Sequence, residues 1–360
     1  MTNPFIKIST QDLFTSLQDK NSIIIDIRPV DAHNGWKLKG EKRGGHIKGA
    51  RSISAKWSKY IDWIEIVRSK GITTNQNIIL YGYNEQDLEK EALQYISAGY
   101  KNVQIYEGFE KEWTVDKKLP MEILGNYKNL VYPLWLNDVL SGKPTQEFDN
   151  DKIVLCHAHY RNPDDYNEGH IFGAIAFDSL LLESPEIWNR RSAEEIKANL
   201  EKSGITHDTT VVLYGRFSFP DNDDPFPGSS SGHLGAMRCA ALMMYAGVKD
   251  VRILNGGLQS WLDEGYSITK EPTEAVPVKD FGVAVPACPE FIVDIPEAKE
   301  MLASEDAELV CVRSWPEFIG EVSGYNYIEK TGRIPGAIFG NCGSDAYHME
   351  NYRNLDHTCL

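Results

Sequence analysis

The turn Gly-His-Ile-Lys-Gly-Ala at residues 45–50 recurs as Gly-His-Ile-Phe-Gly-Ala at residues 169–174 and as Gly-Arg-Ile-Pro-Gly-Ala at residues 332–337. The two constant glycines of this turn indicate backbone positions that need a positive φ or the close approach of another segment. Three copies of one turn in a chain of 360 residues predict a single structural unit that is repeated along the sequence.

An apolar run that ends in polar residues precedes each turn, at Ile23–Arg28, Ile153–Cys156 and Leu309–Arg313. Continuous runs of branched apolar residues suit strands that are buried on both faces of a parallel sheet. When the units are aligned on these runs, Cys156 takes the position of Asp26.

Two further patterns occur twice each: a strand that runs into a loop, at Asn77–Gly82 and Val211–Gly215, and a strand followed by a turn and an aromatic helix, at Val103–Trp113 and Val251–Trp261. Helical stretches alternate with these strands. This alternation predicts parallel βαβ units, and the expected fold class is therefore α/β, a parallel sheet flanked by helices on both faces and repeated in tandem.

The repeats predict three domains: two complete units at residues 1–125 and 126–275, and a partial third unit at residues 285–360. A segment dotted with prolines, residues 270–289, separates the second unit from the third. Its composition predicts an exposed and extended linker.

Composition narrows the class of protein. Hydrophobic residues make up 42% of the chain, which is enough to bury ordinary cores, and the formal net charge of −15 argues against a nucleic-acid partner. No apolar run approaches the roughly 18 residues of a membrane span, and no signal peptide is recognisable at the N-terminus, so we expect a cytoplasmic protein. The six cysteines are widely scattered, which predicts reduced thiols, and neither a metal nor a cofactor is expected.

The order of these motifs resembles the rhodanese family of sulfurtransferases. Asp26-x-Arg28, the turn at 45–50, the strand and loop near Tyr81, and Tyr106–Phe109 with Trp113 carry the resemblance, and the three consecutive units resemble the three-domain bacterial thiosulfate sulfurtransferases. The resemblance implies tandem rhodanese-like domains. It also implies that a cysteine thiolate accepts sulfane sulfur from thiosulfate or a persulfide and passes it to cyanide or another thiol.

The cysteine of such an enzyme belongs in the loop between the third strand pattern and its helix, where backbone N–H groups and the helix N-terminus stabilise a thiolate. No cysteine occupies this loop in either complete unit, and the two loops read Gly82-Tyr83-Asn84 and Gly215-Arg216-Phe217. Both units are therefore predicted to be catalytically silent. By the same spacing, the loop of the third unit is expected near residue 369 or later, beyond Leu360, so no catalytic residue is assigned.

Three arginines of the third unit, Arg313, Arg333 and Arg353, are candidates for binding an anionic sulfur donor. His46 and His170, inside the first two turns, are expected to stabilise those turns through hydrogen bonds rather than to act as general bases.

Cys156-His157-Ala158-His159 with Arg161 suggests a metal site or a Cys-x5-Arg phosphatase loop. Only four residues separate Cys156 from Arg161, so a structural role is favoured. Cys311, in the corresponding strand of the third unit, is predicted to be a small buried residue.

Two hypotheses of function remain open. The first is a member of the thiosulfate sulfurtransferase family whose activity is impaired in this chain. The second is a rhodanese-like module that binds or scaffolds a partner without catalysis. The sequence predicts no oligomeric state.

Overall fold

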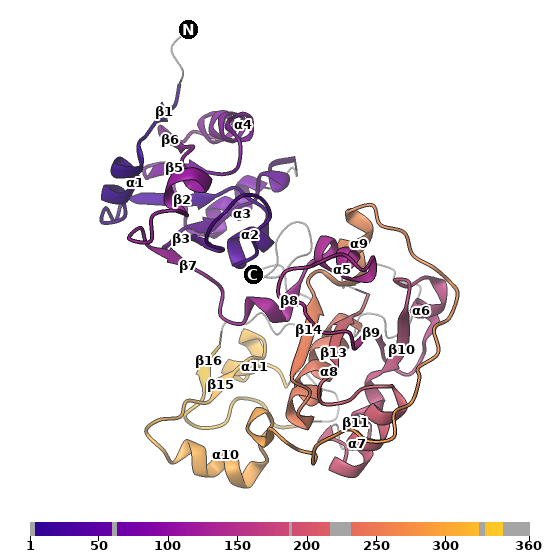
Figure 1. The fold of residues 1–360 in the computed structure, drawn as a ribbon. Helices are drawn as coiled ribbons and strands as arrows, with labels where there is room; N and C mark the ends of the chain where they lie inside the picture. The colour runs from indigo at the N-terminus through magenta and orange to yellow at the C-terminus, as the bar shows by residue number, and fades with distance from the viewer. Residues whose placement is uncertain (1–3, 60–62, 187–188, 217–231, 324–327, 341–360) are drawn as a thin grey trace. The chain divides into compact units, whose positions relative to one another are not determined.

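The computed structural model describes residues 4–59, 63–186, 189–216, 232–323 and 328–340 (Figure 1). It divides into two compact units, Met1–Lys128 and Asn129–Leu360. Each unit contains a five-stranded sheet in which all paired neighbours run parallel.

The sheet of unit 1 has the strand order β1-β6-β5-β2-β4. Its strands, in chain order, are β1 (Ile6–Lys7), β2 (Ser22–Asp26), β4 (Arg51–Ser52), β5 (Asn77–Tyr81) and β6 (Asn102–Tyr106). Its helices are α1 (Thr10–Ser16), α2 (Val30–Asn34), the 3-10 helix η1 (Ala55–Lys59), α3 (Trp63–Ser69), α4 (Glu85–Ser97) and the π-helix η2 (Phe109–Trp113). A short antiparallel pair, β3 (His46–Ile47) and β7 (Met121–Glu122), ties the turn to the end of the unit.

Unit 2 repeats this strand order. Its sheet reads β10-β9-β13-β14-β8, which is the order of unit 1 taken from the opposite edge. The strands are β8 (Leu130–Val131), β9 (Ile153–His159), β10 (Ala174–Asp178), β13 (Thr210–Tyr214) and β14 (Asp250–Leu254). The main helices are α5 (Pro133–Leu140), α6 (Asp164–Glu168), α7 (Ala193–Lys202), α8 (Gly232–Ala246) and α9 (Gly257–Asp263).

The predicted α/β fold with parallel sheets and flanking helices is thus confirmed, and the repeat is visible in the backbone. The second glycine of each turn, Gly49, Gly173 and Gly336, has a φ of 76°, 82° and 85°. A side chain at such a φ is strained, which explains why glycine stands in all three copies.

The last part of unit 2 contains elements of a third repeat. They are the 3-10 helix η6 (Pro289–Phe291), α10 (Ile295–Leu302), β15 (Val310–Cys311), α11 (Trp315–Ile319) and β16 (Ile338–Phe339). β15 pairs in parallel with β16 as β2 pairs with β4. Among the described residues, this sheet has only these two strands.

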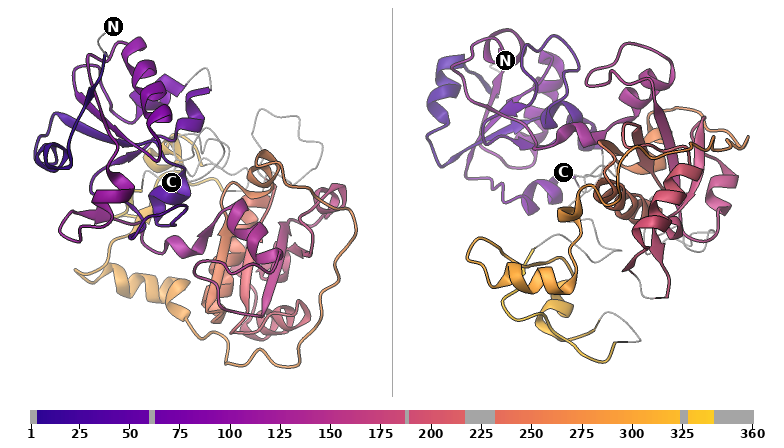
Figure 2. Two further views of the ribbon diagram at one scale, coloured as in Figure 1. Left: turned by 45° about the horizontal axis from the view of Figure 1, so that its top comes forward. Right: turned by 60° about the horizontal axis from the view of Figure 1, so that its bottom comes forward.

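The segment between α9 and η6 runs along the outside of unit 2 (Figure 2). It is extended and largely exposed, as predicted, and Phe281 is its one completely buried residue. The Phe281 side chain is completely buried in the core of unit 2, and the Phe281 N–H donates to Glu201 Oε1 at 2.8 Å. An apolar ring and backbone hydrogen bonds therefore anchor this strap.

No helix among the described residues is both long enough and apolar enough to cross a membrane.

Candidate functional site

The loop Gly82-Tyr83-Asn84 follows β5 directly and leads into α4. This loop, in which a rhodanese-like cysteine is expected, is called the cradle loop below, as is the corresponding loop of unit 2. Asn84 caps the helix, since its side-chain oxygen accepts from the Asp87 N–H at 2.8 Å. A Cβ atom added at Gly82 would lie 2.7 Å from Cγ1 of Ile27. The first position of this loop therefore has no room for a side chain unless Ile27 shifts.

A small pocket of about 180 Å³ lies at this loop. Besides the loop and Leu88 it is lined by Glu85, Glu107, Glu110 and Lys111, so three carboxylates face one ammonium group. Glu85 and Glu107 also pair with Lys7. With Lys7 included, three carboxylates lie beside two ammonium groups, and this remaining negative charge disfavours the binding of an anion such as thiosulfate.

A buried ion pair lies behind the loop. Arg28 donates to both carboxylate oxygens of Asp26, at 2.9 and 2.7 Å, and to the carbonyl oxygen of Gly45 at 2.7 Å. Burial opposes the ionisation of Asp26, but the Arg28 charge and the His33 hydrogen bond outweigh it and hold the pKa of this carboxyl well below its usual range. The Asp26-x-Arg28 motif therefore stabilises the glycine turn.

The corresponding loop of unit 2 begins with Gly215 and Arg216 after β13. The Leu258 N–H donates to the Gly215 carbonyl at 3.0 Å. Phe217, the third predicted loop residue, lies outside the described residues. No thiol is present in the described part of either loop, and the prediction that both units are silent stays a prediction.

A tyrosine at the end of the central strand joins each complete sheet to its glycine turn. The Ile47 N–H donates to Tyr81 Oη at 3.2 Å, and the Ile171 N–H donates to Tyr214 Oη at 2.9 Å. These two hydrogen bonds give an alignment of the units that does not depend on sequence.

This alignment corrects the predicted register of β9. Asp26 pairs across the sheet with Tyr81, whereas His157, not Cys156, pairs with Tyr214. His157 is therefore the counterpart of Asp26. Cys156 is one residue away, on the position of an apolar strand residue, which explains its complete burial.

The buried carboxylate and imidazole exchange places between the units. In unit 1 the strand supplies Asp26 and the helix His33, with Nδ1 and Oδ2 3.0 Å apart. In unit 2 the strand supplies His157 and the helix Asp165, with Nε2 and Oδ2 3.4 Å apart. This pairing accounts for His157 of the apparent metal motif, and no group of three potential metal ligands occurs among the described residues.

The turn histidines stabilise their turns, as predicted. His46 stacks on His33 and His170 stacks on Tyr166, each with ring centroids 3.7 Å apart. The Nδ1 atoms of His46 and His170 lie 2.8 Å from the carbonyl oxygens of His33 and Tyr166.

The two thiols of the second repeat are poorly suited to act as nucleophiles. Cys156 and Cys239 are completely buried, and burial raises the pKa of both thiols far above the usual range. A nucleophilic thiol needs the opposite shift. Cys342 and Cys359 lie outside the described residues.

Cys311 is different, and the prediction that it is buried is wrong. It is partly exposed, and Arg313 Nε donates to Cys311 Sγ at 3.4 Å. Although burial opposes ionisation, hydrogen bonds from Arg313 lower the pKa of the Cys311 thiol. Cys311 holds the position of Asp26 beside its arginine, so it lies at the end of a strand and not in a cradle loop.

The candidate arginines of the third repeat have intramolecular partners. Arg313 Nη2 donates to the Gly332 carbonyl at 2.6 Å, which reproduces the bond from Arg28 to Gly45. Arg333 lies over the Phe318 ring, 4.4 Å from its centroid. Arg353 is outside the described residues. That these three arginines bind an anionic donor stays a prediction.

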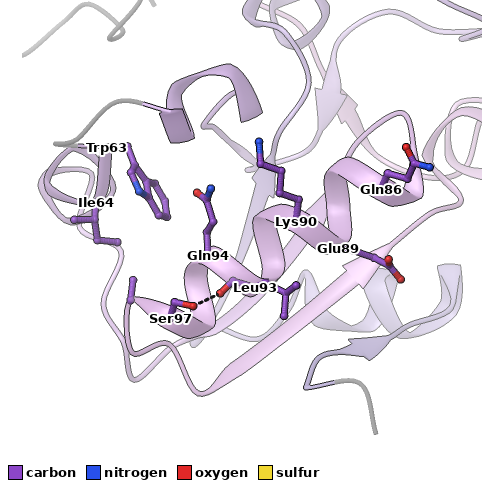
Figure 3. A pocket seen from close by; sticks show the side chains of 9 residues that line it. Trp63, Ile64, Gln86, Glu89, Lys90, Leu93, Gln94 and Ser97 are labelled. Atoms are coloured by element: carbon purple, nitrogen blue, oxygen red, sulfur yellow. Dashed lines mark hydrogen bonds between the residues drawn. The ribbon is translucent and has the colours of Figure 1, made fainter. Parts of the chain in front are cut away.

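A larger hollow of about 730 Å³ lies on unit 1, away from the glycine turn. In Figure 3, the Trp63 indole faces the Gln94 side chain on α4, and Ile64, Lys90 and Leu93 also line the hollow. The remaining lining residues are Gln86, Glu89, Ser97 and Ala98. The hollow has no thiol or imidazole in its lining and so offers no group for sulfur transfer.

Comparison with known proteins covers both units. The family model of the rhodanese-like domain matches residues 9–116 and 145–264. The thiosulfate sulfurtransferase YnjE of Escherichia coli (strain K12) is 37% identical over 346 residues, which are 95% of this chain and 75% of YnjE.

Solved structures extend the likeness. The anaerobic ergothioneine biosynthesis enzyme from Chlorobium limicola, in complex with its natural substrate trimethyl histidine, is 55% identical with a TM-score of 0.93. That alignment covers 99% of this chain and 84% of the solved one. A variant of EanB holds ergothioneine covalently linked with a persulfide cysteine; it is 55% identical with a TM-score of 0.93, and the alignment covers 99% of this chain and 83% of the EanB chain.

Proposed function

We propose that this chain, which belongs to the rhodanese-like domain family, transfers sulfane sulfur from a persulfide to trimethyl histidine. The observation that carries this proposal is the 55% identity and the TM-score of 0.93, over 99% of the chain, to an enzyme with that substrate. Thiosulfate as donor and cyanide or a thiol as acceptor form the second candidate, favoured by the 37% identity to YnjE.

The proposed step transfers one neutral sulfur atom. The sulfur–sulfur bond of a cysteine persulfide breaks while a carbon–sulfur bond forms on the imidazole ring, and the cysteine leaves as a thiolate. The proton of the ring carbon moves to the transferred sulfur, so the step needs no external oxidant. A low thiol pKa favours this leaving group.

The exposure of the glycine turn in the third repeat supports a position there for such a cysteine. Ile334 of its glycine turn is 60% exposed, whereas Ile47 and Ile171, at the same position of units 1 and 2, are completely buried. In those units the covering strand is β5 or β13, which pairs with β2 or β9 and leads into the cradle loop. We propose that the sulfur-carrying thiol lies near β15, which pairs only with β16 among the described residues.

The test uses two proteins: the 360-residue chain, and the Chlorobium limicola enzyme as the positive control. Each is incubated with a polysulfide donor and trimethyl histidine, and ergothioneine is measured by mass spectrometry. We expect ergothioneine from both proteins. Thiocyanate from thiosulfate and cyanide, without ergothioneine, would reject trimethyl histidine in favour of the second candidate.

A non-catalytic binding role is the alternative from a different class. The closed position at Gly82 and the acidic lining of its pocket favour it for unit 1. Calorimetric titration of trimethyl histidine into the chain separates the two: binding without any sulfur product under either donor would support the binding role and contradict catalysis.

A further inference from the structure

In unit 1, outside the cradle loop, two hydrogen-bonding contacts of the Ser58 hydroxyl connect η1 to α4. The Ser58 hydroxyl oxygen lies 2.8 Å from the Ala55 carbonyl oxygen and 2.7 Å from Glu91 Oε1. Glu91 is only 2% exposed. A carboxyl group is therefore enclosed at the contact between these two helices.

Proton counting decides the state of this carboxyl. A serine hydroxyl has one proton, and a backbone carbonyl can only accept. If Ser58 donates to the Ala55 carbonyl, its contact with Glu91 is a hydrogen bond only when the carboxyl itself carries a proton and donates. With an ionised Glu91, two acceptors compete for the single Ser58 proton, and one of them stays unpaired.

The surroundings also favour the neutral acid. Burial, which is the largest cause, raises the pKa of Glu91 to about 7 and outweighs a hydrogen bond donated by Ser58, which would lower it. Among the charged groups of the described residues, Lys90 favours ionisation and Asp87 opposes it, both on α4. The η1 helix, which also carries Lys56 and Lys59, contributes the Ser58 hydroxyl. Tyr95, one turn along α4, is a second buried group whose ionisation Glu91 opposes.

We infer that Glu91 is a protonated carboxylic acid that fastens η1 to α4 through Ser58, and that its ionisation breaks this connection. Ionisation sends the proton to solvent and leaves Ser58 to pair with either the carboxylate or the Ala55 carbonyl. The link is thus a pH-sensitive latch within unit 1. It is independent of the proposed function because neither residue belongs to a cradle loop.

Two variants and one spectroscopic measurement test the latch. Glu91→Gln replaces the acid by an amide that can donate to Ser58 at every pH. Glu89→Gln, on the same helix but only partly buried, is the matched control. In each protein, hydrogen exchange at the amides of Ala55–Lys59 is measured between pH 5 and pH 8.5 and corrected for intrinsic rates, while carbon-13 NMR follows the Glu91 carboxyl.

In the parent chain and in Glu89→Gln, the amides of Ala55–Lys59 should lose protection from exchange several-fold as the pH rises through about 7. The Glu91 carboxyl should titrate with the same midpoint. In Glu91→Gln, the protection of these amides should not change with pH. Since the folded acid holds a proton that the unfolded one loses near 4.5, Glu91→Gln should also raise the melting temperature at pH 8 but not at pH 4. A Glu91 carboxyl that titrates near 4.5, or protection in the parent chain that does not change with pH, would overturn the inference.

Discussion

Gly82 stands at the first position of the cradle loop and Gly215 at the corresponding position of unit 2. In unit 1 the neighbour that excludes a side chain is Ile27, whose Cγ1 is 2.7 Å from the place of an added Cβ. The absence of a cysteine at this position and the close packing are therefore linked, because the Ile27 side chain occupies the space that a cysteine side chain would need.

Replacing Gly82 by cysteine should not restore sulfur transfer. We expect the Gly82→Cys variant to lose roughly 1–3 kcal/mol of unfolding free energy through overpacking, measured by urea denaturation, and to produce no thiocyanate. Gly125→Ala is the control, because an added Cβ meets no atom within 4 Å there. A Gly82→Cys variant of unchanged stability that turns over thiosulfate would show that the cradle is open.

At the level of elements, the strap between α9 and η6 belongs to the fold of unit 2. The Val278 N–H donates to the Glu201 carbonyl, and the His207 N–H donates to the Phe281 carbonyl, both at 2.9 Å. Phe281 adds a completely buried ring to the same core as Leu200 and Ile205.

Phe281→Ala should release this strap. The loss of a buried aromatic ring costs about 3–5 kcal/mol, and we expect faster tryptic cleavage at Lys279 together with a lower melting temperature. Val276→Ala is a suitable control, since Val276 is 80% exposed on the same strap. Equal cleavage rates in the two variants would mean that the ring does not hold the segment.

The sequence predicts elements more reliably than their register. The glycine turns and apolar runs place the strands correctly because burial and backbone strain leave a periodic signal. The run Ile153–His159 gives an alignment with unit 1 that is wrong by one residue. In the sequence either Cys156 or His157 can be aligned with Asp26, and only the pairing of His157 with Tyr214 shows which alignment is correct. The burial of Phe281 cannot be predicted from the sequence, because one aromatic residue in a proline-rich segment produces no hydrophobic periodicity.

On the scale of the whole chain, the candidate site is less predictable than the fold. The sequence shows directly that the loop positions lack cysteine. The carboxylates around the first loop, however, come from two separate segments, Glu85 at the start of α4 and Glu107 with Glu110 after β6, that only folding brings together. The partial exposure of Cys311 likewise depends on which strands cover the third repeat.

The thiols buried in the second repeat should carry no sulfur. Peptide-mapped mass spectrometry of the chain after loading with thiosulfate or polysulfide tests this claim most directly. We expect no cyanide-labile extra sulfur on Cys156 or Cys239, because burial keeps both as thiols. A cyanide-labile persulfide on either of these two cysteines in the folded chain would contradict this expectation.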